Sequence, residues 1–200
     1  MSTTKIEFAV QMTCESCVDA VKKSVENVEG IKSVDVDLKT DSVVIDSNLS
    51  TLDLQKKLES TGRKVAVKGY AGSSAAVSIL EAGDRSIQGV VRFVQVTPNV
   101  CIIDGTIDGL KAGPHQISIH ECGDLSEGCN SVGNIYNSNN KSGRMYGNID
   151  TVFAEKNGRA AFRLEDNVIK LSEVIGRSFV ISDKTENNKN EKKTGLWYYC

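Results

Sequence analysis

Two cysteines near the N-terminus have a spacing that suits metal chemistry. Cys14 and Cys17 are separated by two residues, and they lie between an apolar run at 8–10 and a segment with helical periodicity. The free N–H groups at the start of a helix favour the thiolate form of a nearby cysteine. Two soft thiolates suit Cu(I), which tolerates a low coordination number. We therefore predict that Cys14 and Cys17 are the ligands of a Cu(I) ion.

Other uses of a Cys-x-x-Cys pair stay open at this point. Structural zinc usually has four ligands, and this half of the chain has no second Cys-x-x-Cys or Cys/His pair. A thioredoxin-like redox pair is the main rival, although that motif belongs to a different order of strands. Chemically inert cysteines are the third alternative. The position of the pair at a strand–helix junction favours copper transfer over both.

The composition limits the class of protein. The chain has 200 residues, 40% of them hydrophobic and 25% charged, which is typical of one large or two small globular domains. A net charge of -2 gives no electrostatic reason to expect binding to nucleic acid or to an anionic membrane. No apolar run approaches the ~20 residues that span a bilayer, and no signal peptide is evident. We therefore expect a cytoplasmic protein, in a compartment where paired cysteines are more often metal ligands or redox groups than disulfides.

The elements around the cysteine pair follow a known order. The segment 5–10 is predicted to be a strand, and valines at helical spacing predict a helix over 15–27. Further strands are predicted at 31–38, 42–46 and 65–68, with a second helix that begins at the capping Ser50 and ends at Gly62. The order β-α-β-β-α-β within about 68 residues is the ferredoxin-like arrangement of an α+β domain.

The second half of the chain has the pattern of an all-β domain. The segment 70–75 is rich in glycine and serine, and we predict that it links a domain at 1–69 to a domain at 76–183. No helical period is evident beyond it. Short β-rich runs separated by turn signals indicate a sandwich or barrel, and they lie at 76–80, 89–96, 100–107, 116–120, 160–164, 168–171 and 178–182. The polar tail at 184–200 is predicted to be disordered.

The motif around the cysteine pair resembles a known family. The segment MTCESC at 12–17 matches the MxCxxC motif of heavy-metal-associated domains, and the resemblance covers residues 1–68. In that family both cysteines bind Cu(I), and the methionine packs beneath the loop. The resemblance therefore implies that Cys14 and Cys17 are ligands and that Met12 supports them.

A second resemblance covers about residues 76–183. The segment GPHQISIHECGD at 113–124 is similar to the H-x-x-H-x-H-E-x-G-D motif of copper/zinc superoxide dismutases. Four further segments occur in matching order, namely IQGVVRF at 87–93, GCNSVGN at 128–134, LEDNVIKL at 164–171 and VIGRSFVIS at 174–182. The resemblance implies a superoxide dismutase-like Greek-key barrel.

The metal ligands of the dismutases do not carry over to this chain. By resemblance, His115 matches their structural histidine and His120 matches one copper ligand. The other ligand positions hold Ser118, Ile135, Met145, Asn148 and Ser182. The chain has two histidines, so the imidazoles that a dismutase copper centre requires are missing. We therefore expect no dismutase activity and interpret His120 as a hydrogen-bonded strand residue.

The combination of a copper-binding domain and a metal-free dismutase barrel resembles the family of copper chaperones for superoxide dismutase. The resemblance implies that the first domain carries Cu(I), and that the barrel docks copper/zinc superoxide dismutase through a dimer-like face. In this chain the face corresponds to 123–129 and 174–177, where Ile175 is suited to apolar packing. The resemblance also leaves room for a homodimer.

The C-terminus departs from that family. The chain ends in TGLWYYC at 194–200, and the barrel's last strand, its arginine loop and a C-terminal CxC pair are not evident. We therefore expect a truncated or alternative ending, in which the disulfide partner of Cys129 is missing and Cys200 is a lone thiol. Cys122 replaces a residue that is not cysteine in the dismutase motif, and Cys101 is expected in the core. The alternatives to copper delivery are a regulatory or decoy partner of superoxide dismutase and a dismutase of low activity.

Overall fold

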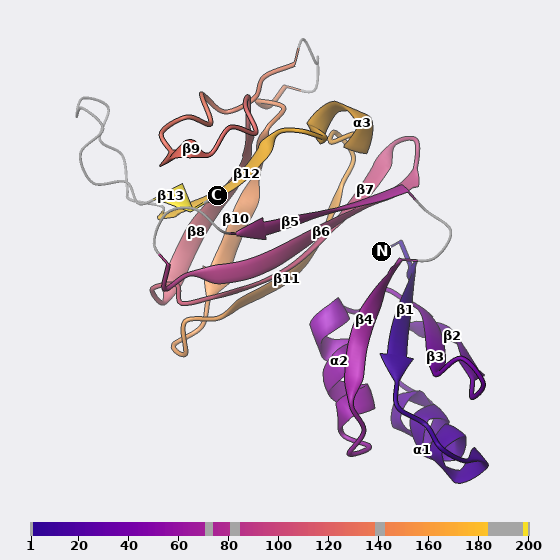
Figure 1. Cartoon of the computed structure of the whole chain (residues 1–200). Helices are drawn as coiled ribbons and strands as arrows, with labels where there is room; N and C mark the ends of the chain where they lie inside the picture. The colour runs from indigo at the N-terminus through magenta and orange to yellow at the C-terminus, as the bar shows by residue number, and fades with distance from the viewer. Residues whose placement is uncertain (1, 71–73, 81–84, 139–142, 184–197, 200) are drawn as a thin grey trace. The chain divides into compact units, whose positions relative to one another are not determined.

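The computed structural model describes residues 2–70, 74–80, 85–138, 143–183 and 198–199. They belong to two compact units, Met1–Ala75 and Ala76–Cys200 (Figure 1). Most of the predicted tail lies outside the described residues, and so does the middle of the predicted linker. No helix in the described ranges is long and apolar enough to cross a membrane.

The N-terminal unit is a four-stranded antiparallel sheet with two helices (Figure 1). Its elements are β1 (Thr4–Val10), α1 (Glu15–Val25), β2 (Ile31–Asp37), β3 (Ser42–Ser47), α2 (Thr51–Glu59) and β4 (Val65–Tyr70). The strands lie in the order β2-β3-β1-β4. This is the ferredoxin-like order that the sequence predicts, and the side chain of Ser50 caps α2 by accepting the N–H of Asp53.

The core of this unit joins the two helices to one face of the sheet. Every second residue of β1 is buried, because the side chains of a strand alternate between its two faces. The buried set that packs together is Ile6, Phe8, Val10, Met12, Cys17, Val18, Val21, Val25, Val43, Ile45, Leu54 and Leu58. The packing holds the first turn of α1 against the end of β1, and this junction carries the cysteine pair.

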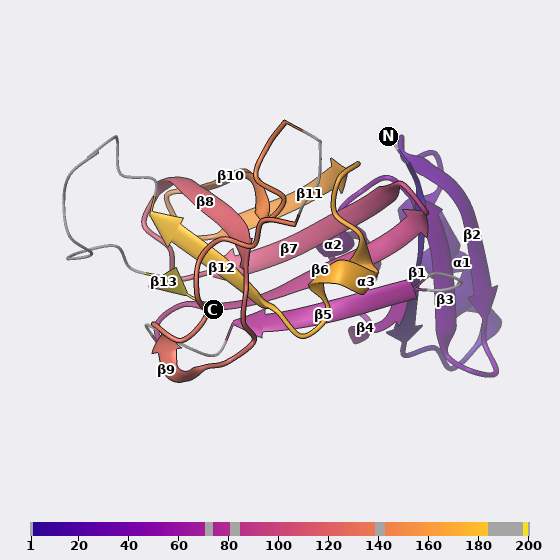
Figure 2. The ribbon, with the colours of Figure 1, turned by 90° about the horizontal axis from the view of Figure 1, so that it is seen from above.

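The C-terminal unit consists of two four-stranded sheets that enclose a second core (Figure 2). Its elements are β5 (Ser74–Leu80), β6 (Gln88–Thr97), β7 (Val100–Asp108), β8 (Gly113–His120), β9 (Ser126–Cys129), β10 (Asn148–Ala154), β11 (Ala160–Asp166), α3 (Leu171–Val174), β12 (Ser178–Asp183) and β13 (Tyr198–Tyr199). One sheet has the order β11-β7-β6-β5 and the other the order β10-β8-β12-β13. The unit is the all-β, barrel-like domain that the sequence predicts.

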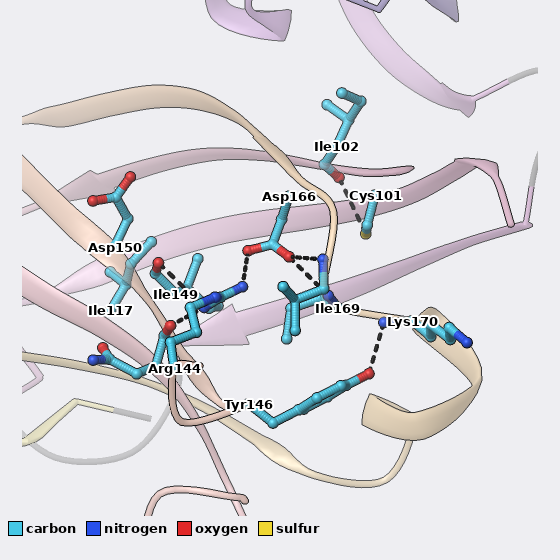
Figure 3. Close-up of polar contacts among 12 residues, drawn as sticks. Cys101, Ile102, Ile117, Arg144, Tyr146, Ile149, Asp150, Asp166, Ile169 and Lys170 are labelled. Carbon is cyan, nitrogen blue, oxygen red and sulfur yellow. Dashed lines mark hydrogen bonds and ion pairs between the residues drawn. The ribbon is translucent and has the colours of Figure 1, made fainter. Parts of the chain in front are cut away.

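One predicted strand of this unit, at 168–171, is wrong. The segment passes from irregular backbone into the short helix α3. Its backbone N–H groups donate to side chains: Asp166 Oδ1 accepts from Ile169 at 2.7 Å, and Tyr146 Oη accepts from Lys170 at 2.8 Å (Figure 3). Because these donors already have partners, the apolar run does not add a strand to either sheet.

The end of the chain also differs from the expectation. We expected residues 184–200 to be disordered and the last barrel strand to be absent. The structure has the short strand β13 instead, which pairs with the edge of β12 in the register Ile181 with Tyr199. An edge strand such as β12 presents backbone N–H and C=O groups to solvent, and β13 pairs with these groups.

Candidate metal-binding site

The two cysteine sulfurs lie close together at the start of α1. Cys14 has an extended backbone and immediately precedes the helix, while Cys17 lies in its first turn. The N–H of Cys17 donates to the carbonyl oxygen of Cys14 at 2.9 Å, which closes the turn. The two Sγ atoms are 3.2 Å apart. Metal–thiolate bonds are roughly 2.3 Å long in zinc sites, so one ion of similar size can contact both sulfurs at this separation.

The two thiols have different surroundings. Cys17 is 8% exposed and belongs to the hydrophobic core, whereas Cys14 is exposed. The Ser16 hydroxyl lies 3.0 Å from the Cys14 sulfur, and the Thr13 hydroxyl lies 3.7 Å from the Cys17 sulfur. The pair therefore combines one anchored sulfur with one that is open to solvent.

An arginine from the turn between α2 and β4 favours the thiolate form of Cys17. The Arg63 side chain hydrogen-bonds the Cys17 sulfur, and Thr13 and Cys14 make further hydrogen bonds to it. Together they lower the pKa of Cys17 to about 6. The guanidinium is itself held in place, since Arg63 Nη1 donates to the Thr61 carbonyl at 2.9 Å. Sequence reasoning missed Arg63, because a single basic residue before β4 carries no motif.

Met12 supports the loop from below. Its side chain is buried in the core of the N-terminal unit, next in the chain to the loop that carries Cys14. This agrees with the place that the resemblance implied. No cluster of three or more histidine, cysteine or acidic side chains suitable for a metal occurs in the described parts of the chain. The cysteine pair offers two sulfurs, which would suit a soft ion with few ligands.

The two histidines of the C-terminal unit are buried, and each lies within hydrogen-bond distance of a backbone carbonyl oxygen. His120 is buried, and its Nδ1 lies 3.0 Å from the Gly133 carbonyl oxygen. Burial lowers the pKa of His120, so the ring is neutral at pH 7. His115 is also buried, with Nε2 at 2.8 Å from the Lys111 carbonyl oxygen and Nδ1 at 3.0 Å from Asp183 Oδ1.

The other positions that match dismutase ligands carry no metal-binding set. Asn148 Oδ1 accepts from the Gln116 amide at 2.5 Å, and Met145 is exposed. Ser118 and Ser182 are buried in neighbouring strands, and Ile135 forms an isolated bridge with the strand residue His120. Neither histidine belongs to a group of three or more histidine, cysteine or acidic side chains that could hold a metal ion, among the residues that the structure describes.

Comparison with known proteins assigns both units to families. The model of the heavy-metal-associated domain matches residues 7–64, and that of copper/zinc superoxide dismutase matches residues 87–196. Proteins named copper chaperone for superoxide dismutase, from Sus scrofa and Homo sapiens, are 46% and 45% identical to this chain over 190 residues. The match covers 89% of this chain and 69% of each relative. The chain belongs to the copper chaperones for superoxide dismutase.

A solved structure supports the fold of the dismutase-like unit of this chaperone. The crystal structure of the clock protein EA4 is 27% identical in sequence and has a TM-score of 0.54. The similarity covers 66% of this chain and 94% of that protein.

One face of the dismutase-like unit of this chaperone exposes large apolar side chains. Ile175, which follows α3, is 63% exposed, and it lines a shallow pocket together with Val77 of β5 and Gly176. Gly123 packs directly against Gly176, because a Cβ atom on Gly123 would lie 2.4 Å from the Gly176 carbonyl oxygen. Both predicted segments of the dimer-like face, 123–129 and 174–177, are thereby brought together.

Arg177 ties the segment 174–177 of the chaperone to Glu121, which lies just before the segment 123–129. Its Nη1 donates to the Glu121 carbonyl at 2.7 Å, and its Nε donates to the Glu173 carbonyl at 2.8 Å. The guanidinium also lies 3.5 Å from the centroid of the Tyr136 ring, a cation–π contact. The face around Ile175 is therefore built on a fixed backbone.

The remaining cysteines of this chaperone take different states. Cys101 is fully buried, as expected, and burial raises the pKa of its thiol to about 12. Cys122 is a free, exposed thiol. Cys129 is disulfide-bonded, a point that the sequence left open. Cys200 itself lies outside the described residues.

Proposed function

We propose that this chaperone carries one Cu(I) ion between Cys14 and Cys17 and delivers it to copper/zinc superoxide dismutase. The observation that carries the proposal is the pair of sulfurs 3.2 Å apart, of which Cys17 has a pKa of about 6. A thiolate, and not a thiol, is the metal ligand, so at neutral pH Cys17 needs no deprotonation before it binds copper. The names of the relatives, copper chaperones for superoxide dismutase, support the same cargo and the same recipient.

The geometry suits a site that both holds and releases copper. Cu(I) with two thiolates has a net charge of −1, and the Arg63 guanidinium offsets that charge at the Cys17 side. Cys14 faces solvent, so an incoming thiolate of a recipient can reach the ion from that side. A two-ligand site leaves room for that third sulfur, and transfer then proceeds by ligand exchange without a change of oxidation state.

The dismutase-like unit supplies the docking surface in this proposal. The exposed Ile175 and the close packing of Gly123 against Gly176 give an apolar patch on a fixed backbone, which is what a specific interface requires. The same unit is proposed to have no dismutase activity of its own, because the described part of the chain gathers no set of metal ligands there. Its role is then recognition.

A reducing compartment, the cytoplasm, is part of the proposal. Cys14 and Cys17 are free thiols with sulfurs in contact, and in an oxidising compartment such a pair forms a disulfide and loses its affinity for copper.

The test has two steps, both on the full reduced chain. Anaerobic metal analysis after loading with Cu(I) should give one copper per chain, and Cys14→Ser with Cys17→Ser should give none. Cys122→Ser, which removes an exposed thiol outside the site, is the matched control and should still bind one copper. Undiminished copper in the double variant overturns the assignment of the ligands.

The second step measures delivery. The loaded chain is mixed with copper-free superoxide dismutase, and the gain of dismutase activity is followed. Activation of the enzyme supports delivery. A chain that binds copper and the enzyme without activating it is instead the decoy partner, which is the alternative to the chaperone function.

A further inference from the structure

The loop at 11–14 joins β1 to α1 and carries Cys14. It is held by Asp41, a residue of the β2–β3 hairpin. This residue lies in the turn between β2 and β3, beside the point where β1 ends. Its backbone carbonyl accepts the N–H of Val10 at 2.9 Å, and its carboxylate Oδ1 accepts the N–H of Met12 at 3.1 Å. Asp41 therefore contacts the two residues on either side of Gln11, where β1 passes into the loop.

The opposite side of the loop is held by the segment that carries Arg63. The N–H of Gln11 donates to the carbonyl oxygen of Lys64 at 3.1 Å. Three successive N–H groups, those of Val10, Gln11 and Met12, thus have partners from two other parts of the fold. The Asp41 carboxylate provides the last of these ties before Cys14.

The two cysteines depend on this tie to different degrees. Cys17 is positioned by its own helix, because it is buried in the core shared by α1 and the sheet. Cys14 is exposed, and the contacts of its sulfur are local, to Ser16 at 3.0 Å and to Cys17 at 3.2 Å. The Cys14 carbonyl ties its backbone to α1 on one side, so the place of the Cys14 sulfur depends further on the backbone that leads to it from β1.

We propose that Asp41 is a positioning residue for copper, which keeps Cys14 within reach of the ion held by Cys17. The proposal rests on the proposed function of the pair. Binding through two ligands is tight when both are already in place, because ordering a mobile ligand costs free energy. Loss of the Asp41 carboxylate frees the loop on one side. The Cys14 sulfur must then be ordered when copper binds, and this lowers the affinity for Cu(I).

The backbone conformation of Asp41 limits the substitutions that can test its positioning role. Its φ is 52°, in the left-handed region, where asparagine and glycine are tolerated better than other residues. Asp41→Gly keeps this conformation accessible and removes the acceptor. Asp41→Asn keeps an oxygen at the same place and removes the charge. Thr40→Ala is the matched control, because the Thr40 hydroxyl bonds Asp37 within the same hairpin and not the metal loop.

The experiment measures Cu(I) affinity of the full reduced chain by competition with a chromogenic Cu(I) chelator under nitrogen. We expect Asp41→Gly to bind copper about tenfold more weakly, the scale of one hydrogen bond. Asp41→Asn and Thr40→Ala should stay within about twofold of the unaltered chain or bind more tightly, since neither removes the acceptor for Met12. Amide exchange at Met12 should accelerate in Asp41→Gly alone, which shows that the loop and not the whole unit has loosened.

The outcomes separate this proposal from the proposed function. If Asp41→Gly binds copper as tightly as the unaltered chain, or if Asp41→Asn loses as much affinity as Asp41→Gly, the positioning role is wrong. If the unaltered chain itself binds no Cu(I), the proposed function fails first. If the Met12 amide exchanges no faster in Asp41→Gly, the carboxylate does not hold the loop and the proposal is overturned on that ground.

Discussion

Arg63 and Cys17 come from different ends of the N-terminal unit's sequence, yet the Arg63 side chain hydrogen-bonds the Cys17 thiol and is the largest cause of its low pKa. Arg63 lies between α2 and β4, and Cys17 lies in the first turn of α1. The contact favours the thiolate form of this sulfur, which is the form that binds metal.

Removing the guanidinium should weaken the acidity of this thiol. In Arg63→Gln the pKa of Cys17 should rise from about 6 toward the ordinary value near 8.5, because its largest stabilising hydrogen bond to a cation is lost. The thiolate absorbance near 240 nm, followed against pH in a Cys14→Ser background, measures this. Lys64→Gln removes the neighbouring exposed charge and should leave the titration of Cys17 unchanged. An equal pKa shift in both variants would mean that any nearby positive charge lowers the pKa, and not Arg63 in particular.

Copper affinity should depend on pH in a defined window. Because the pKa of Cys17 is lowered to about 6, its contribution to binding is fully present above that pH and is lost as the pH falls through 6. Below the pKa, each further unit should weaken binding by up to about tenfold from this group alone. Chelator competition between pH 5 and 8 checks the prediction, and in Arg63→Gln the loss should begin at a higher pH.

Docking should depend on Ile175. Ile175→Asp places a charge in the apolar patch, and in a complex this charge would be buried without a partner, so binding to copper-free superoxide dismutase should fall at least tenfold. The control is Phe153→Asp, which changes an equally exposed apolar residue on β10, outside the two segments of the proposed face. Calorimetric titration compares the two variants, and equal binding by Ile175→Asp and the unaltered chain would place the interface elsewhere.

The Asp166 carboxylate should stabilise the dismutase-like unit. It is buried, pairs with Arg144 and accepts the backbone N–H of Ile169 (Figure 3). Asp166→Ala leaves these donors without their acceptor, so the unfolding free energy of this unit should fall by about 2–4 kcal/mol. Asp150→Ala, an exposed carboxylate nearby, should cost less than about 0.5 kcal/mol. Urea denaturation of the metal-free chain, with the transition of the N-terminal unit as internal reference, measures both.

The dismutase-like unit should hold neither copper nor zinc tightly. The positions that match dismutase ligands carry Ser118, Ile135, Met145, Asn148 and Ser182, and burial keeps the His120 ring neutral and packed. The full chain with Cys14→Ser and Cys17→Ser, exposed to zinc and then dialysed, should contain less than a tenth of an equivalent of zinc by elemental analysis. Stoichiometric zinc in that variant would require a site built from other residues.

The local pattern of the sequence determined most of the N-terminal unit. The helical spacing of Val18, Val21 and Val25 and the cap at Ser50 depend only on near neighbours, and the structure places both helices where these signals predict. The Cys14–Cys17 spacing likewise allows the two sulfurs to approach each other, because a single turn of backbone connects the residues.

Other features were decided by tertiary structure. The run at 168–171 has the composition of a strand, but Asp166 and Tyr146 take its backbone donors, and no local pattern reveals that competition. The strand β13 forms because β12 has an open edge to pair with. Arg63 and Asp41 reach the metal loop only after the sheet has brought their turns to the end of β1. The sequence by itself determined which atoms could bind copper. The fold decided which of the two sulfurs has the lowered pKa, which is exposed and what holds the loop that leads to them, because those properties depend on contacts between residues that are distant in the chain.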